Sequence, residues 1–119
     1  MKILLVDDEY DLVSTLAERL SLRDIDADWS RSGEDALKTL QNKSYDIAVL
    51  DVKMPHMGGL ELREKIHAIY PEMKYIFMTG HGSADDFNAA ASKEGSDCYL
   101  VKPVNIDILI KKITSILAA

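Results

Sequence analysis

The chain has 119 residues, the length of one ordinary domain, and its 47% hydrophobic content is sufficient for a buried core. Its 20 acidic residues outnumber the 14 basic ones, and the net charge of −6 argues against unaided binding to a nucleic-acid backbone or an anionic membrane surface. A single cysteine, Cys98, excludes a disulfide framework and a four-cysteine zinc site. No apolar run is long enough to cross a bilayer, so we expect one cytoplasmic domain over residues 1–119.

Short apolar segments alternate with segments of helical periodicity along the whole chain. The strands are predicted at residues 2–6, 27–30, 46–50, 74–78 and 97–101. The helices that follow them are predicted at residues 10–22, 33–41, 60–69, 84–94 and 105–117. Ser32 is a suitable N-cap for the second helix, and Gly95 can end the fourth.

Four of the predicted strands are apolar on both faces, which is typical of a parallel sheet covered by helices on each side. The segment Asp26-Ala27-Asp28-Trp29 alternates polar and apolar residues instead, as an edge strand does. Strict alternation of strands and helices with right-handed crossovers predicts a doubly wound α/β fold of three layers, α/β/α, with a five-stranded parallel sheet and five helices.

Chemically active side chains follow several of the predicted strands. Asp7, Asp8 and Glu9 follow the first strand, and the third is followed by Asp51. The fourth strand is followed by the hydroxyl of Thr79, and the fifth is followed by the amine of Lys102. Since ligands of open parallel sheets bind beyond the carboxyl ends of the strands, we expect these side chains to form one site.

Three carboxylates on one rim repel one another, at about 4 kcal/mol per pair for a separation of 4 Å and an effective dielectric of ~20. Lys102 can offset only one of these charges, whereas Mg²⁺ binds carboxylates and leaves positions for a phosphate oxygen. Lys102 and the Thr79 hydroxyl can contact other phosphate oxygens. Asp51, at the end of a central strand, is the best candidate for a nucleophile that forms an aspartyl phosphate.

The segments that carry these residues resemble the receiver domain of two-component response regulators. They are Ile-Leu-Leu-Val-Asp-Asp-Glu at residues 3–9, Leu-Asp-Val-Lys-Met-Pro at 50–55 with Met-Gly-Gly at 57–59, Met-Thr-Gly at 78–80 and Tyr-Leu-Val-Lys-Pro at 99–103. The similarity covers essentially the whole chain. It implies a flavodoxin-like fold with strand order 2-1-3-4-5. Position 58, where the family often has Asp, is glycine.

The resemblance implies a phosphorylation site and a metal site. Asp51 matches the phosphoacceptor, which receives its phosphoryl group from the phosphohistidine of a sensor histidine kinase or a phosphotransfer protein. Asp8, with Asp7 acting through water, matches the acid pair that binds Mg²⁺ together with Asp51 and the backbone carbonyl of Lys53. Lys102 matches the lysine that pairs with the acyl phosphate.

The resemblance also implies how phosphorylation acts on the rest of the molecule. Thr79 matches the hydroxyl that reorients onto the phosphoryl group, and Tyr99 matches the aromatic residue that then turns inward. The surface that changes is formed by the predicted fourth helix, fifth strand and fifth helix. It would control an output domain or a protein partner, or a phosphorylation-dependent homodimer. The bond between Lys102 and Pro103 is expected to be cis.

Other functions remain open from the residues alone. A Mg²⁺-dependent phosphohydrolase typically needs a second carboxylate two residues after its nucleophile, where this chain has Lys53. A flavodoxin-like electron carrier needs a Ser/Thr/Gly-rich loop after the first strand, where acidic residues stand. A receiver domain that serves only as an interaction module is a third alternative. At the level of single residues, the acids at positions 7–9 can cap the first helix, and Asp51 can be a turn residue.

Overall fold

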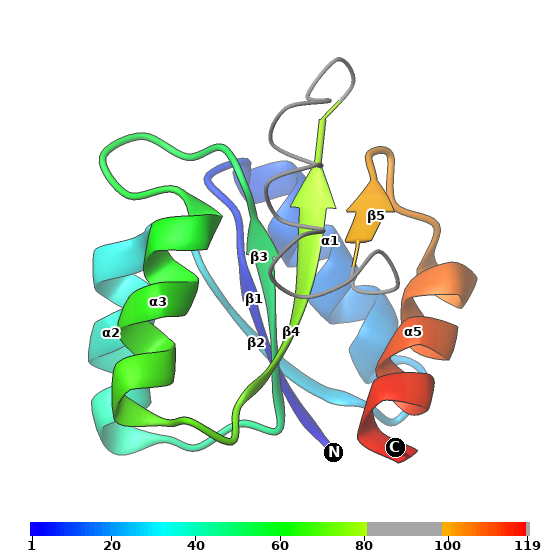
Figure 1. Ribbon diagram of the computed structural model, residues 1–119. Coiled ribbons are helices and arrows are strands. Elements are labelled where there is room, and N and C mark those ends of the chain that lie inside the picture. Colours follow the sequence, from blue (N-terminus) through cyan, green and yellow to red (C-terminus); the bar gives the residue numbers. More distant parts are fainter. Residues whose placement is uncertain (81–98, 119) are drawn as a thin grey trace.

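The computed structural model describes residues 1–80 and 99–118, and these residues form a doubly wound α/β fold (Figure 1). A parallel sheet of five strands lies at its centre in the order β2-β1-β3-β4-β5. The strands are β1 (Lys2–Val6), β2 (Asp26–Ser30), β3 (Ile47–Asp51), β4 (Lys74–Thr79) and β5 (Tyr99–Val101). The parallel sheet and its strand order are therefore confirmed.

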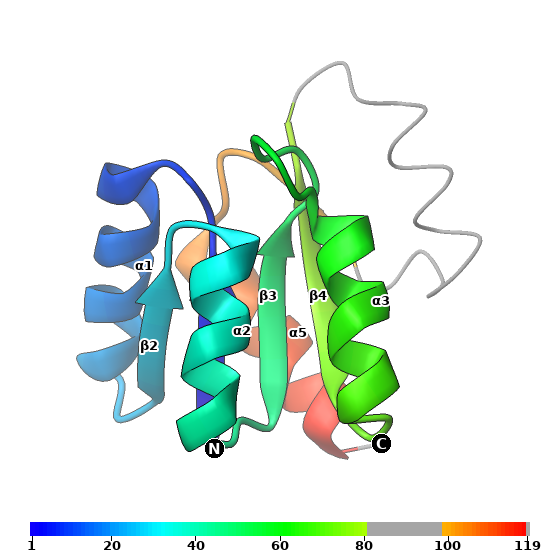
Figure 2. The same cartoon turned by 90° about the vertical axis from the view of Figure 1, so that its left-hand side faces the viewer.

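Helices cover both faces of the sheet, which confirms the three-layer architecture (Figures 1 and 2). One face carries α1 (Tyr10–Ser21) and α5 (Ile106–Ala118), and the other carries α2 (Gly33–Asn42) and α3 (Gly59–Ile69). The predicted fourth helix, at residues 84–94, lies outside the described residues, as do the first two residues of the predicted fifth strand. Among the described helices, none is both long enough and apolar enough to span a membrane.

The inner strand β1 shows why the predicted inner strands are apolar on both faces. Alternate side chains of β1 point to opposite layers: Ile3 and Leu5 belong to the core beneath α1 and α5, whereas Leu4 and Val6 belong to the core beneath α2 and α3. All four side chains are fully buried. Such a strand can exist only where helices cover it on each side.

At one edge of the sheet, β2 is only partly covered, as its alternating pattern predicts. In the described part of the chain it pairs with β1 alone. Trp29 remains 39% exposed and packs edge-on against Tyr10, with ring centroids 5.3 Å apart. On the opposite face of the strand, the Tyr45 hydroxyl donates a hydrogen bond of 2.6 Å to Asp28 and so ties β2 to the connection between α2 and β3.

Two strands extend one residue further toward the site than the sequence predicts. Asp51 is the last residue of β3 and pairs with Met78, and Thr79 is the last residue of β4 and pairs with Val101. Both polar side chains are therefore anchored by the sheet itself and not by a connecting loop. Beyond β5, the peptide bond between Lys102 and Pro103 is cis, as expected.

The start of α3 packs directly on the end of β3, and glycines permit this approach. Gly58 is the N-cap, and no side-chain hydrogen bond caps the helix. A Cβ atom at Gly58 would lie 2.7 Å from the carbonyl oxygen of Val52, and one at Gly59 would collide with the carbonyl oxygen of Asp51. Glycine at position 58 cannot cap the helix with a side chain, but it allows the start of α3 to pack closely on the backbone of Val52.

Candidate functional site at the carboxyl edge of the sheet

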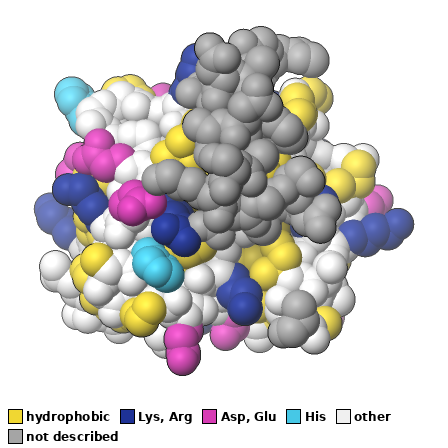
Figure 3. Space-filling model, in the orientation of Figure 1, with side chains coloured by type: hydrophobic (Ala, Val, Ile, Leu, Met, Phe, Trp, Pro, Cys, Tyr) yellow, Lys and Arg dark blue, Asp and Glu magenta, His cyan; other side chains and the backbone are white. Residues whose placement is uncertain are grey.

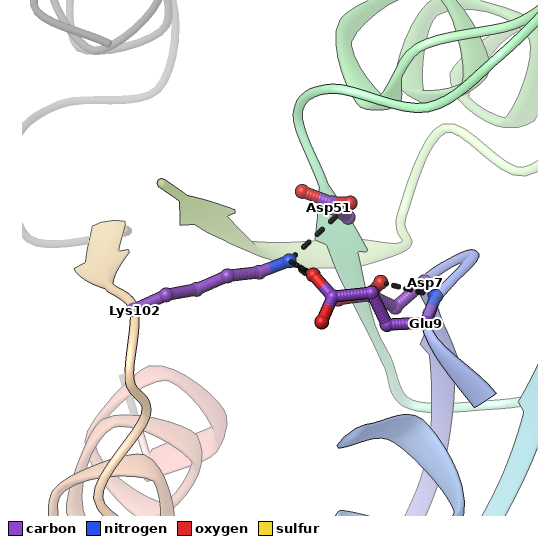
Figure 4. A network of polar contacts seen from close by, with 4 residues as sticks. All are labelled: Asp7, Glu9, Asp51 and Lys102. Carbon is purple, nitrogen blue, oxygen red and sulfur yellow. Dashed lines mark hydrogen bonds and ion pairs between the residues drawn. The ribbon is translucent and has the colours of Figure 1, made fainter. Parts of the chain in front are cut away.

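The carboxyl ends of β1, β3 and β5 bring three carboxylates together around the amine of Lys102 (Figure 4). Its Nζ lies 2.8 Å from Oδ2 of Asp7 and 3.4 Å from Oδ2 of Asp51. A third carboxylate, Oε1 of Glu9, lies 3.3 Å away. The predicted convergence of Asp7, Asp51 and Lys102 is therefore present.

Asp7 is held rigidly at the end of β1. Its side chain is fully buried, its backbone N–H donates to the carbonyl of Ser30 at 3.1 Å, and its Oδ1 accepts a hydrogen bond of 2.9 Å from the backbone N–H of Glu9. Asp8 follows as a half-buried residue at the mouth of the site. The turn after β1 thus aims one acid at Lys102 and leaves the next accessible to a ligand.

The carboxylates of Asp7, Asp8 and Asp51 form a set suited to a divalent cation. Each offers one oxygen, and these oxygens lie within 4.8 Å of one another. Hard oxygen donors, some buried and one partly open to solvent, are the ligands that Mg²⁺ prefers, and Mg²⁺ usually keeps several water molecules in addition. The side chains present therefore fit a Mg²⁺ ion.

The pKa values of the site reflect the burial of its carboxyl groups. The pKa of the Asp51 carboxyl is raised to about 7: burial raises it most and the charge of Asp7 adds to this, whereas Lys102 and a backbone hydrogen bond from Lys53 act in the opposite direction. Burial also raises the pKa of Asp7. The pKa of Lys102 is itself raised: burial lowers it, but the hydrogen bond to Asp7 and the charges of Asp51 and Asp7 outweigh that effect.

Thr79 and Tyr99, the two predicted switch residues, lie on the neighbouring strands β4 and β5. Thr79 is 3% exposed, directly follows Met78, which pairs with Asp51, and its carbonyl accepts a hydrogen bond of 2.8 Å from the backbone N–H of Lys102. Tyr99 is buried, and its ring stacks on that of Phe77 with centroids 5.2 Å apart. The sheet therefore links Thr79 to β3, which ends in Asp51, on one side and to the segment that carries Lys102 on the other.

Two further residues, Lys53 and Glu9, lie at the edge of the site. Lys53, predicted to offer its carbonyl to the metal, is exposed in the connection between β3 and α3. Glu9 contacts Lys102, a role that the sequence analysis did not assign although it placed Glu9 at this rim. Its position directly after Asp8 was the available signal, but a contact with a lysine that is distant in sequence requires the closed sheet.

Comparison with known proteins identifies the family. The model of the response regulator receiver domain matches residues 3–114. The transcriptional regulatory protein GlrR of Escherichia coli (strain K12) is 34% identical over 111 residues, which cover 93% of this chain and 25% of GlrR. The heme response regulator HssR of Staphylococcus aureus (strain Newman) is 33% identical over 117 residues, which cover 98% of this chain and 51% of HssR.

A solved structure shows the same likeness in three dimensions. The CheY-like response regulator receiver domain protein from Methanospirillum hungatei JF-1 is 32% identical, with a TM-score of 0.87, and the match covers 98% of this chain and 93% of that protein. The chain spans only about a quarter to a half of the curated relatives named above. With its fold, its carboxylate cluster and these matches, the chain belongs to the response regulator receiver domain family.

Proposed function

We propose that this domain is a phosphoacceptor switch whose acceptor is Asp51. The observation that carries the proposal is the ion pairing of a single amine, Lys102, with two buried carboxylates, Asp7 and Asp51, at the carboxyl edge of the sheet. An incoming phosphoryl group needs an attacking carboxylate and positive charge to balance its oxygens, and this rim has both. Membership of the receiver family supports the same assignment.

The proposed reaction transfers a phosphoryl group from a phosphohistidine. An oxygen of Asp51 forms a bond to phosphorus while the bond between phosphorus and the imidazole nitrogen breaks, and that nitrogen keeps the electron pair. The product is an acyl phosphate on Asp51. The donor is a sensor histidine kinase or a phosphotransfer protein.

Asp8 and Asp51 would hold Mg²⁺, with Asp7 acting through water and Lys53 offering its carbonyl. A bound Mg²⁺ supplies the positive charge that the carboxylates and phosphoryl oxygens lack. Lys102 supplies the remaining charge and pairs with the acyl phosphate once Asp51 no longer carries a free carboxylate.

The signal would leave the site through the edge formed by β4 and β5. In this proposal, the Thr79 hydroxyl donates a hydrogen bond to the phosphoryl group, and Tyr99 occupies the space that Thr79 leaves. The ring of Tyr99 on β5 is already buried against Phe77 of β4, the strand that lies next to β3 and Asp51. The affected surface comprises β5, α5 and the segment at residues 84–94, and it would contact an output domain, another protein or a second copy of the domain.

The test is incubation with Mg²⁺ and acetyl phosphate, followed by intact mass measurement. We expect the mass to increase by one phosphoryl group, only when Mg²⁺ is present, and we expect no increase for Asp51→Asn. Asp35→Asn, which removes an exposed acid in the first turn of α2, is the matched control and should react as the wild type does. Labelling of Asp51→Asn, or a wild type that is never labelled, would contradict the proposal.

A further inference from the structure

A groove of about 500 Å³ runs along the open edge of the sheet, away from the phosphorylation site. In Figure 2, β2 lies between α1 and α2, and these two helices form the walls of the groove. Ala27, Asp28 and Trp29 of β2 form its floor. The walls carry small polar and charged side chains, among them Ser14, Glu18, Thr39 and Lys43.

The backbone of β2 offers hydrogen-bonding groups to this groove. The carbonyl of Ser30 accepts a hydrogen bond from Asp7, so the polar groups of Ser30 point toward β1, and those of Asp28, two residues earlier, point the same way. In a parallel ladder the intervening residues point in the opposite direction. The N–H and C=O groups of Ala27 and Trp29 therefore face the groove, and the described part of the chain places no strand beyond β2.

The side chain of Asp28 adds a fixed negative charge beside these groups. The hydrogen bond from the Tyr45 hydroxyl, 2.6 Å long, orients the carboxylate and holds the pKa of Asp28 below its ordinary value. Lys43 is 3.5 Å from the same oxygen, and its side chain is 54% exposed, so an incoming cation can take its place. Glu18 on the wall of the groove contributes a second negative charge.

A second copy of this chain is a poor occupant of the groove. Two β2 strands can pair antiparallel so that the backbone groups of Ala27 and Trp29 bond to those of the second copy. In this pairing, Asp28 of one copy lies directly opposite Asp28 of the other. Like charges directly opposite one another destabilise a strand pair, and edge strands use such charges to avoid self-association. The same position favours a partner strand with a cationic residue opposite Asp28.

We propose that this groove binds an extended peptide segment, which adds to the sheet beside β2 and places an arginine or lysine opposite Asp28. Ala27 and Trp29 provide the main-chain hydrogen bonds, and the carboxylate of Asp28 selects the cation. The flanking side chains of such a peptide lie on the face of Ala27, whose small size leaves room between the strand and α1. Peptide binding at this groove requires neither Asp51 nor its phosphorylation.

The test is an NMR titration of the ¹⁵N-labelled protein with the capped peptide Thr-Val-Arg-Val-Thr and with the same peptide carrying Glu in place of Arg. We expect saturable shifts centred on the amides of residues 27–29, with a Kd of about 1 mM or tighter for the Arg peptide. The Glu peptide should bind at least about tenfold more weakly, because it sets two carboxylates opposite each other.

Two variants separate the backbone contribution from the charge. Asp28→Asn should lose the preference for Arg over Glu, whereas Glu34→Gln, an exposed acid at the start of α2, should keep it. Ala27→Pro removes one N–H group from the open edge of β2 and should weaken the binding of both peptides. If Ala27→Pro does not fold, Asp28→Asn still tests the proposal. Equal binding of the two peptides, shifts away from β2, or concentration-dependent shifts of β2 without peptide would each overturn the proposal.

Discussion

At the scale of single residues, the site is organised around one amine that serves several carboxylates. Lys102 lies within 3.4 Å of both Asp7 and Asp51, and both carboxyl groups are buried. Burial raises the pKa of both carboxyl groups, and the nearby charge of Lys102 offsets this only in part. When no cation is bound, the ionisation of these buried carboxyl groups therefore lowers the stability of the folded state. This loss can be measured as a dependence of stability on pH.

The first prediction concerns Asp51 with divalent ions removed. Its folded pKa of about 7 lies above the ordinary value of 3.8, so between these values the folded state binds a proton that the unfolded state has released, and stability falls as the pH rises. Asp51→Asn should therefore be more stable than the wild type by about 1–4 kcal/mol near pH 8 and should show no advantage near pH 4. Urea unfolding at several pH values measures this difference.

The matched arm of that experiment adds Mg²⁺ near pH 8. The ion should stabilise the wild type more than Asp51→Asn, because a ligand that binds only the folded state raises its stability by mass action. If the two proteins had the same pH profile and the same response to Mg²⁺, the carboxylate of Asp51 would not be the group whose ionisation lowers the stability.

The second prediction concerns Tyr45, whose contribution to stability grows as the pH rises, whereas that of Asp51 falls. Its hydrogen bond lowers the pKa of Asp28, so the stabilisation is present above the ordinary pKa of an aspartate and is lost as the pH falls through the lowered value. Tyr45→Phe should cost about 1–2 kcal/mol near pH 7 and progressively less near pH 3. Tyr70→Phe is the control: the Tyr70 hydroxyl donates to the carbonyl of Leu40, and that loss should not vary with pH over this range.

At the scale of secondary-structure elements, strand ends and helix starts position the chemistry. The contact between the end of β3 and the start of α3 is the tightest example, since it relies on the absence of side chains at Gly58 and Gly59. The backbone that carries Asp51 is thereby clamped between the sheet and a helix. A bulkier residue at this contact has to move one of them.

The third prediction tests this clamp. Gly59→Ala places a Cβ atom against the carbonyl oxygen of Asp51 and 3.1 Å from Cα of Val52, and it should lower the free energy of unfolding by about 1–3 kcal/mol. Gly80→Ala is the matched control, because a Cβ atom there meets no atom of residues 1–80 and 99–118 within 4 Å, and its effect should stay within about 0.5 kcal/mol. Thermal or urea unfolding measures both. Equal effects of the two substitutions would show that the contact at Gly59 carries no strain.

Much of this architecture could be predicted from the sequence because burial leaves a local pattern. The continuous apolar strands and the alternating edge segment predicted the sheet, and residues that follow strand ends predicted the site. The bond from Tyr45 to Asp28 and the contact of Glu9 with Lys102 could not be found in this way. Each joins residues whose proximity depends on how whole elements pack, and no local periodicity encodes that packing.

At the scale of the whole molecule, the described residues form one α/β fold in which the two proposed sites lie at different edges of the sheet. The proposed phosphorylation site lies at the carboxyl ends of the strands, and the proposed peptide groove lies along the lateral edge of β2. Between the phosphorylation site and a partner surface, the signal has to cross β4 and β5. A single hydrogen bond to a charged group is worth about 1.5–3 kcal/mol, whereas a shift from 1:99 to 99:1 requires about 5.5 kcal/mol.

The fourth prediction follows from that difference. Thr79→Ala should still accept a phosphoryl group on Asp51, but it should transmit the change poorly, because Lys102 alone cannot complete the shift. In backbone NMR with beryllofluoride as a mimic of the phosphoryl group, shifts at residues 99–112 should become smaller in the variant, while shifts around Asp51 persist. A variant that gave the full wild-type pattern at residues 99–112 would place the coupling elsewhere.

The central claim is that Asp51 becomes an acyl phosphate, and borohydride reduction tests it most directly. Borohydride converts the acyl phosphate of an aspartate into homoserine, so peptide mass mapping locates the modified residue. After incubation with Mg²⁺ and acetyl phosphate, we predict homoserine at position 51, and none when Mg²⁺ is omitted. Homoserine at position 7 or 8 instead, or a phosphoryl group that survives reduction on a serine or threonine, would contradict the account.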